Sequence, residues 1–322
     1  MISVISAVRN GAAHVEASLA SVLQATDVPL EVIVVDDGAT DQTPAMLEAW
    51  ARRDQRLRVI RQETRGFTPA LNAAVQVARG EYLARHDLDD CSLPGRLEAQ
   101  RRYLDRHPEC AAVGAAADII DAHGRRVGTL PYAIGAAAVR EGLLSLRTTP
   151  VHGSMMIRRN TLEAIGGYRV AFRAAQDYDL WLRLSERFAI DILPEVLYQW
   201  RLHTESAYGQ RRQEQLLFAG VARVFAQERA EVGRDSYQLL VDCAGDFEQF
   251  ADRYRLSAPL RALWGELLYR ASNDPVVARR HLWRALRTGH RGMRTVALLL
   301  WSAAGLPWPG GTPLRPIPTP RP

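Results

Sequence analysis

The sequence predicts an α/β fold in which a mostly parallel, doubly wound sheet is flanked by helices and followed by a C-terminal helical extension. Short apolar runs of strand length alternate with segments of helical periodicity over residues 1–90. Several of these runs are continuously apolar, as expected for parallel strands buried on both faces. From residue 207 the composition changes to arginine-rich segments of helical pattern. We therefore predict an α/β domain at 1–206, a helical extension at 207–306 and a proline-rich, extended or disordered tail at 307–322.

The elements of the first domain follow in order from these patterns. Predicted strands lie at 2–8, 31–35, 57–60 and 81–85, and predicted helices at 14–24, 44–53 and 68–78. Pro44 and Pro69 suit the first turns of two helices, and Gly80 closes the last of them. Farther along we predict a helix at 94–107, a strand from 111, a hairpin around 123–124, a helix at 136–146 and a strand at 151–158.

Length and composition limit the classes of function that the chain can have. A chain of 322 residues with 47% hydrophobic and 24% charged residues is typical of a soluble globular protein. The three cysteines are scattered and form no C-x-x-C pair, which argues against a disulfide framework or a zinc site and favours the cytoplasm. The net charge is +5, and every basic side chain is arginine. This charge allows anionic ligands such as nucleotides or a lipid surface, but no basic and aromatic cluster predicts nucleic-acid binding.

Two segments bear on membranes. Met1 is followed at once by an apolar run, so we expect no signal peptide. The apolar stretch 295–306 is shorter than the roughly 20 residues that a membrane-spanning helix needs. A buried final helix is the simpler interpretation. The alternative is an interfacial helix, through which the C-terminal helices would bring the protein to the inner face of the membrane.

Acidic residues follow two of the predicted strands. Asp36 and Asp37 end the second strand, and Asp87, Asp89 and Asp90 follow the fourth. Ligands of open α/β sheets bind at the carboxyl ends of the strands. Three carboxylates within four residues repel one another, and a cation or ligand would relieve this, although a solvated acidic loop is the simpler interpretation of the stretch alone. The loop after the first strand is not G-x-G-x-x-G, and there is no P-loop, which argues against dinucleotide oxidoreductases and P-loop NTPases.

Four segments together carry a resemblance to a known family. They are the opening strand, V-V-D-D-G-x-T-D-x-T at 34–43, R-G-x-x-x-A-L-N at 65–72 and D-x-D-D-x-S-x-P-x-R-L at 87–97. The chain resembles an inverting family 2 glycosyltransferase of the GT-A fold over roughly residues 1–205. The resemblance implies a metal-dependent, hexosyltransferase-like enzyme. It would take a nucleotide-diphosphate sugar with Mg²⁺ or Mn²⁺, and its acceptor would be a saccharide, a glycolipid or another hydroxyl, in cell-surface polysaccharide or glycolipid synthesis.

The resemblance assigns roles in the nucleotide-binding half, residues 1–90. It makes Asp89 the metal ligand and places Asp87 toward the ribose or nucleotide. A hard divalent cation prefers such oxygen ligands, and carboxylates at i and i+2 of an extended segment point the same way. Asp37 would accept a hydrogen bond from the base, which favours a UDP or dTDP sugar. Asp36 would either contact the ribose or hold its own loop. The other nucleotide-side candidates are Ala7, Arg9 and Arg65.

The resemblance also places residues in the acceptor half, 91–206. His152 would lie near the sugar or metal, or be structural, and Gly153 would let the backbone approach the donor. Asp177, in Q-D-x-D-L-W-x-R, matches the family's general base. At a helix N-terminus its ionised form would be stabilised, although an N-cap aspartate would have the same position. Arg201 or His203 would meet the diphosphate or the metal.

Two other functions stay open at this point. A sugar nucleotidyltransferase shares the α/β sheet and a metal, but it would need a glycine-rich, basic loop after the first strand, where this chain has only Arg9-Asn10-Gly11. A non-catalytic binding or scaffold protein on a decayed transferase fold would use the helical tail. Gln176 favours this second alternative, because the family usually has glutamate there.

Overall fold

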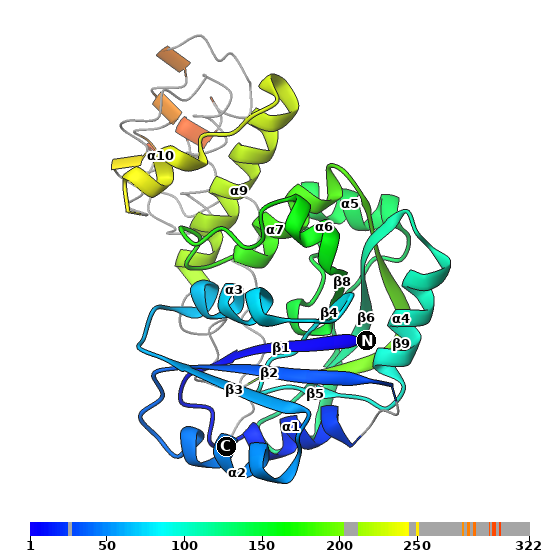
Figure 1. Ribbon diagram of the computed structural model, residues 1–322. Coiled ribbons are helices and arrows are strands. Elements are labelled where there is room, and N and C mark those ends of the chain that lie inside the picture. The colour runs from blue at the N-terminus through cyan, green and yellow to red at the C-terminus, as the bar shows by residue number, and fades with distance from the viewer. Residues whose placement is uncertain are drawn as a thin grey trace. The chain divides into compact units, whose positions relative to one another are not determined.

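The computed structural model describes residues 1–24, 28–202, 212–244 and 249–250, together with isolated positions between 279 and 303 (Figure 1). The chain divides into two compact units, Met1–Ser206 and Ala207–Pro322. The elements of the first unit are β1 (Ile2–Val8), α1 (Val15–Leu23), β2 (Leu30–Asp37), α2 (Thr43–Arg53), β3 (Leu57–Gln62), α3 (Phe67–Val77), β4 (Tyr82–Arg85), β5 (Cys91–Ser92), α4 (Arg96–Arg106), β6 (Cys110–Ile120), β7 (Arg126–Thr129), α5 (Ala136–Ser145), the 3₁₀ turn η1 (His152–Ser154), β8 (Met156–Arg158), α6 (Arg159–Ala164), α7 (Gln176–Ser185) and β9 (Ala189–Arg201).

One mixed sheet organises the first unit. Within the described residues its strand order is β3-β2-β1-β4-β8-β6-β9-β5, with β7 paired to β6. β1 pairs in parallel with β2 and with β4, and Ile5 lies opposite both Ile33 and Arg85. The carboxyl ends of these three strands therefore meet at one edge, where ligands of such sheets bind. The predicted α/β fold with a mostly parallel sheet is confirmed, and antiparallel β5, β7 and β8 make the sheet mixed.

Alternate residues of the parallel strands pack against helices on opposite faces, as the period of a strand requires. Val4 and Val32 share a buried cluster with α1, α2 and α4. The intervening residues Ile5 and Ile33 are also fully buried and point to the other face, where α3 covers β1 and β2. Figure 1 shows α1 and α2 on one side of β1 to β3 and α3 on the other. Burial on both faces explains the continuously apolar strands.

The structure differs from the predicted elements at two places near the acidic stretch. The strand predicted at 151–158 is wrong in its first part, because residues 152–154 form η1, where Ser154 Oγ donates to the carbonyl of Val151 (2.9 Å). The helix predicted from Pro94 begins at Arg96 instead. Gly95 has a φ of 80°, a left-handed conformation that glycine adopts at little cost and that sets the entry into α4.

Helix α7 is fixed by a buried ion pair. Arg183 Nε donates to Asp179 Oδ2 (2.9 Å), one turn earlier, and the two side chains are 5% and 0% exposed. The guanidinium also donates to the carbonyls of Ile165 and Gly167, both at 2.8 Å. The pair therefore ties the helix to the segment that precedes it, and Asp179 has the structural role that a buried, paired carboxylate usually has.

The second unit is helical where the structure describes it. It contains α9 (Arg212–Val232) and α10 (Tyr237–Asp242). Phe218 and Phe225 of α9 are fully buried, and the Phe225 ring meets Phe250 edge to face at 5.9 Å between centroids. The predicted tail at 307–322 lies outside the described residues, and the apolar stretch at 295–306 is described only at isolated positions. No helix in the described part of the chain is long and apolar enough to cross a bilayer.

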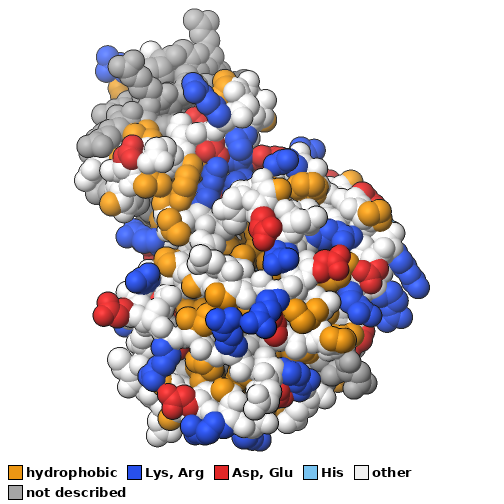
Figure 2. Space-filling view, in the orientation of Figure 1, with side chains coloured by type: hydrophobic (Ala, Val, Ile, Leu, Met, Phe, Trp, Pro, Cys, Tyr) orange, Lys and Arg blue, Asp and Glu red, His pale blue; other side chains and the backbone are white. Residues whose placement is uncertain are grey.

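Arginines are scattered over the surface. Figure 2 shows them mixed with acidic and apolar side chains across the face in view. Several pair with carboxylates, as Arg61 does with Glu48 (3.1 Å) and Arg53 with Glu16 (3.6 Å). Such exposed pairs contribute little to stability, so the positive charge acts mainly on solubility and on the approach of anionic ligands.

We expect Arg183→Met to lower the free energy of unfolding by about 3–5 kcal/mol, because it leaves the buried Asp179 carboxylate without its main partner. A urea titration followed by tryptophan fluorescence measures this change. The matched control is Arg187→Met, which removes an exposed arginine just after the same helix and should cost no more than about 1 kcal/mol. Equal stability of the two variants would contradict the structural role of the pair.

Candidate active site

The loops after β1 and β2 are joined by hydrogen bonds at the shared edge of the sheet. The amide of Thr40 donates to Asn10 Oδ1, and the amide of Gly11 donates to Thr43 Oγ1, both at 2.8 Å. Asp36 is buried and accepts from the amide of Ala39 (2.8 Å). Of its two predicted roles, the structure therefore supports the one in which Asp36 holds its own loop.

Asp37 fixes the segment that begins α3. Its carboxylate accepts hydrogen bonds from the amides of Arg65 (2.8 Å) and Gly66 (2.9 Å) and from Gln62 Nε2 (2.7 Å). The backbone of the Arg65–Gly66 segment is thereby held against the end of β2, while the Arg65 side chain is exposed. The contact of Asp37 with a base stays a prediction, since the contacts present are all within the protein.

The two remaining candidates of the nucleotide half lie at the end of β1. Ala7 is buried in the strand, opposite Val35 of β2. Arg9 follows the strand, and its side chain is exposed. Together with Arg65, Arg9 gives this edge of the sheet two exposed cations.

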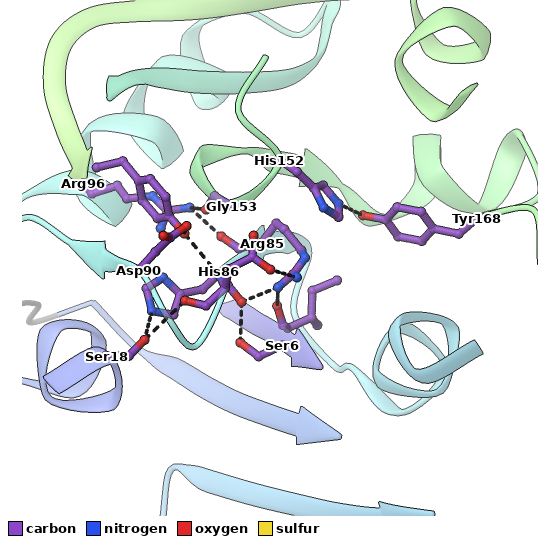
Figure 3. A network of polar contacts seen from close by, with 12 residues as sticks. Ser6, Ser18, Arg85, His86, Asp90, Arg96, His152, Gly153 and Tyr168 are labelled. Atoms are coloured by element: carbon purple, nitrogen blue, oxygen red, sulfur yellow. Dashed lines mark hydrogen bonds and ion pairs between the residues drawn. The ribbon is translucent and has the colours of Figure 1, made fainter. Parts of the chain in front are cut away.

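The acidic stretch contains its own counter-charge. Arg85, the last residue of β4, is fully buried, and its guanidinium pairs with Asp87 Oδ1 (Figure 3). The same group donates to the carbonyls of His86 and Ile5 (3.0 Å to Ile5). Burial raises the pKa of Asp87 and outweighs the opposite effect of Arg85. His86 is also buried, its Nε2 lies 2.8 Å from Ser18 Oγ, and burial lowers its pKa, so the imidazole is neutral.

Asp90 is clamped by the last strand of the domain. Its carboxylate accepts from Tyr198 Oη (2.8 Å) and from the amide of Arg201 (2.7 Å), and both partners lie on β9. Burial raises the pKa of Asp90 well above its usual value, and repulsion from Asp89 and Asp87 adds to this. Asp90 therefore holds the loop against β9, and we do not expect it to bind a ligand.

The same clamp occupies Arg201. Its Nε donates to the carbonyl of Asp89 (2.7 Å) and its Nη1 to that of Asp121 (3.0 Å), and the side chain is buried. This geometry favours a role in holding the acidic loop and does not favour the predicted contact with a diphosphate. His203, the other candidate of this segment, lies outside the described residues.

Arg96 and Gly153 hold η1 against the acidic stretch. Arg96 Nη2 donates to the carbonyls of Arg85 (2.7 Å) and Gly153 (2.8 Å), and burial lowers the pKa of this guanidinium to about 10, so it stays charged. A Cβ at Gly153 would overlap Tyr198 Oη and lie 2.9 Å from Asp87 Oδ2. These side chains require glycine at position 153, and the close approach of its backbone to the donor stays a prediction.

His152 lies within a group of aromatic rings. Its Nε2 is 2.8 Å from Tyr168 Oη, and its ring meets those of Trp181 (6.0 Å), Tyr168 (5.6 Å) and Phe67 (6.4 Å) edge to face. Burial lowers the pKa of His152, and the positive charge of Arg85 lowers it further. The imidazole is therefore neutral. Figure 3 shows this pair and the Arg96–Gly153 contact on either side of Arg85.

Asp177 is the second residue of α7. The N-cap position belongs to Ala175, so the N-cap alternative is wrong. The amides of Tyr178 and Asp177 lower the pKa of the carboxyl, as expected at a helix N-terminus. Burial nevertheless outweighs them and raises the pKa of Asp177 to about 6, with a further increase from Asp87 and an opposing effect of Arg85. The prediction that the ionised form is stabilised overall is therefore corrected. The effects of Asp87 and Arg85 on Asp177 indicate that the start of α7 lies near the end of β4.

The acidic side chains present suit a divalent cation whose other coordination positions are filled by a bound ligand and water. No group of three or more histidine, cysteine or acidic side chains within the described residues could hold an ion alone. Asp87 and Asp89 are both partly exposed carboxylates that follow β4. The predicted extended segment is wrong, because the amide of Asp90 donates to the carbonyl of Asp87 (3.0 Å) and closes a turn. One or two carboxylates with phosphate oxygens and water are the usual ligands of Mg²⁺, so this pair fits the predicted metal.

Sequence reasoning missed Arg85, Arg96 and Tyr198 as parts of the site. Arg85 had a usable signal, because an arginine at the end of a buried apolar strand needs a partner. Arg96 is the arginine of the D-x-D-D-x-S-x-P-x-R-L motif, but the motif alone predicts no role for it in the site. The contact of Tyr198 with Asp90 spans 108 residues, and no local pattern indicates it.

Comparisons with known proteins agree with this geometry. The family model described as "Glycosyl transferase family 2" matches residues 3–174, more than half of the chain. The Bacillus subtilis (strain 168) protein EpsE is 32% identical over 206 residues, which is 62% of this chain and 72% of that protein. The O-antigen biosynthesis glycosyltransferase WbnJ of Escherichia coli is 30% identical over 210 residues, or 64% of this chain and 81% of WbnJ.

Solved structures show the same fold. S. aureus TarS 1–349 in complex with UDP-GlcNAc matches with a TM-score of 0.61 and 19% identity, over 95% of this chain and 92% of that chain. The mannosyltransferase PcManGT from Pyrobaculum calidifontis, in complex with GDP-Man and Mn²⁺, matches with a TM-score of 0.55 and 22% identity, over 94% and 79% of the two chains. The predicted GT-A architecture is confirmed, and the chain belongs to glycosyl transferase family 2.

Proposed function

We propose that this protein transfers a sugar from a nucleotide-diphosphate donor to an acceptor hydroxyl with inversion, with Asp177 as the general base. The observation that carries the proposal is the Asp177 carboxyl in the first turn of α7, whose pKa is raised to about 6 by burial and, to a smaller extent, by the charge of Asp87. A base with a pKa just below neutral pH is ionised yet still accepts a proton readily.

The donor nucleotide would lie at the edge formed by β1, β2 and β4. Arg9 and Arg65 are exposed there and would meet its negative charge, and Asp37 holds the Arg65–Gly66 backbone in place. The Asp37 carboxylate would also accept a hydrogen bond from a ring NH of the base, which favours a UDP or dTDP sugar. TarS is complexed with UDP-GlcNAc, which supports a uridine donor, whereas PcManGT is complexed with GDP-Man.

Asp89, with Asp87 beside it, would hold Mg²⁺ or Mn²⁺. A bound ion would neutralise the diphosphate as it leaves. Arg85 keeps the Asp87 carboxylate fixed through Oδ1, and the Asp90 clamp keeps the loop that carries both residues in place. PcManGT, whose structure contains Mn²⁺, supports the metal.

The acceptor oxygen would approach from the side of α7. The ionised Asp177 carboxylate removes its proton while the oxygen attacks the anomeric carbon from the face opposite the nucleotide, which inverts the configuration. His152 is neutral and held by Tyr168, so it adds no charge beside the sugar. A saccharide or glycolipid acceptor in cell-surface polysaccharide synthesis is supported by WbnJ, an O-antigen biosynthesis glycosyltransferase.

Asp177→Asn should lower the transfer rate by about 10²–10⁴-fold, the usual contribution of a general base, while leaving nucleotide binding unchanged. Transfer and donor hydrolysis are measured with a panel of UDP, dTDP and GDP sugars. The control Glu195→Gln, at an exposed position of β9, should behave as wild type. Near-normal transfer by Asp177→Asn would refute the base assignment. A wild-type chain that neither transfers nor hydrolyses any donor would favour the non-catalytic alternative.

The raised pKa of Asp177 predicts an acidic limb in the pH profile. The carboxyl must be ionised to act, so kcat/KM should be constant above its pKa of about 6 and fall about tenfold per pH unit well below it. The Asp177→Asn variant should lack this limb and keep a low, flat rate. A wild-type profile that stays level to pH 5 would show that no group with this pKa controls the reaction.

Asp89→Asn should abolish the response to metal. We expect a chelator to stop donor turnover by the wild type and Mn²⁺ or Mg²⁺ to restore it, whereas the variant should stay inactive at any metal concentration that restores the wild type. A thermal-unfolding comparison shows whether the variant is folded. Full recovery of Asp89→Asn activity by added metal would show that Asp89 is not the metal ligand.

A further inference from the structure

Phe67 is an exposed aromatic residue at the centre of the proposed site. It is the first residue of α3 and follows directly on the Arg65–Gly66 segment that Asp37 holds. The residue is 36% exposed, although most aromatic rings of this domain are buried in its core. Its position is rigid, because Gly66 is bound on one side and Thr68 Oγ1 donates to the carbonyl of Phe172 (2.8 Å) on the other.

The Phe67 ring contacts both halves of the site. The Arg85 guanidinium carbon lies 5.2 Å from the ring centroid, over one face of the ring. The ring of His152 meets it edge to face, at 6.4 Å between centroids and 71° between planes. Arg85 pairs with Asp87, and His152 contacts Trp181, which lies one helical turn after Asp177. Contacts therefore link Phe67 to the nucleotide-side acid through Arg85, and to the helix that carries the proposed base through His152 and Trp181.

The contact with Arg85 shields one face of the ring. Arg85 is fully buried, and its Nε has no hydrogen-bond partner among the described residues. A guanidinium over an aromatic face is attracted by the negative potential of that face, which partly offsets the missing hydrogen bond. Because Arg85 covers this face, a ligand can reach the ring only at its opposite face or its edge.

We propose that the exposed face of Phe67 is the stacking surface for the ring of the donor sugar. This inference rests on the proposed function. In that function the transferred carbon must lie within reach of an acceptor oxygen next to Asp177, while the diphosphate stays beside Asp87, so the sugar ring spans the interval that Phe67 occupies. A pyranose presents C–H groups on its flatter face, and an aromatic face with its negative potential attracts them.

Affinity for the sugar part of the donor tests this proposal. Titration calorimetry with Mn²⁺ would compare UDP with UDP-GlcNAc, and GDP with GDP-mannose, on the full chain. Phe67→Leu keeps an apolar side chain over Arg85 but removes the aromatic face. For the pair of ligands that the wild type binds, it should weaken nucleotide-sugar binding by about 3- to 10-fold and leave the nucleoside diphosphate within about twofold. Phe67→Tyr, which keeps the ring, should retain wild-type affinity for both.

Two controls show whether a change in affinity is specific to Phe67, and three outcomes would contradict the proposal. Tyr132→Leu removes an exposed aromatic ring elsewhere in the unit and should change neither affinity, and thermal unfolding should show that every variant is folded. Equal weakening of both ligands by Phe67→Leu would place the ring against the nucleotide and overturn the sugar assignment. Unchanged binding of both ligands would also overturn it. A wild type that binds neither kind of ligand would contradict the proposed function itself, and the inference with it.

Discussion

The structure depends on how three carboxylates within four residues are accommodated at the end of β4. In water the three carboxylates would repel one another only weakly. Here the loop that carries them connects β4 to β5 and is partly buried, so the repulsion between their charges is stronger. Arg85, the last residue of β4, neutralises Asp87, which follows the strand two residues later. Asp90 is buried, with a raised pKa and two hydrogen bonds from β9. The buried cation of Arg85 and the buried clamp from β9 thus give the loop a defined shape.

This clamp makes the last strand of the domain part of the site. Tyr198 and Arg201 reach the acidic loop from β9, and β9 also pairs with β5, directly after the loop. Tyr198 further accepts from the amide of Asp87 (3.2 Å) and leaves no room for a side chain at position 153. A truncated domain that lacked β9 would therefore leave Asp90 buried without its two donors. The acidic loop and the last strand of the domain are coupled physically in this way.

Some of the site could be predicted from the sequence because it follows from local rules. Parallel strands place their carboxyl ends at one edge, so the positions of Asp37 and Asp87 followed from the strand order alone. The partners of these acids could not be predicted, because they depend on contacts between segments far apart in the chain. Asp37, for example, is occupied by amides 28 and 29 residues later.

The pKa of Asp177 shows the same limit. Its position at a helix N-terminus was visible in the sequence, and the two amides there lower the pKa as that position predicts. The sign of the net change is set by burial, which depends on everything packed around α7. The position of Asp177 in the helix therefore predicts the smaller effect, the lowering of its pKa by the amides. The larger effect, the raising of its pKa by burial, depends on the folded domain.

Arg85 has opposite consequences for the groups around it, and this explains why one buried cation serves both halves of the site. Its charge lowers the pKa of Asp87 and Asp177, which favours their ionised forms against the effect of burial. The same charge lowers the pKa of His152, which favours the neutral imidazole and acts together with burial. Near neutral pH, one guanidinium thus favours a charged base at Asp177 and an uncharged ring at His152. A neutral side chain at position 85 would weaken both preferences at once, while burial, the largest effect on the pKa of each of these groups, would remain.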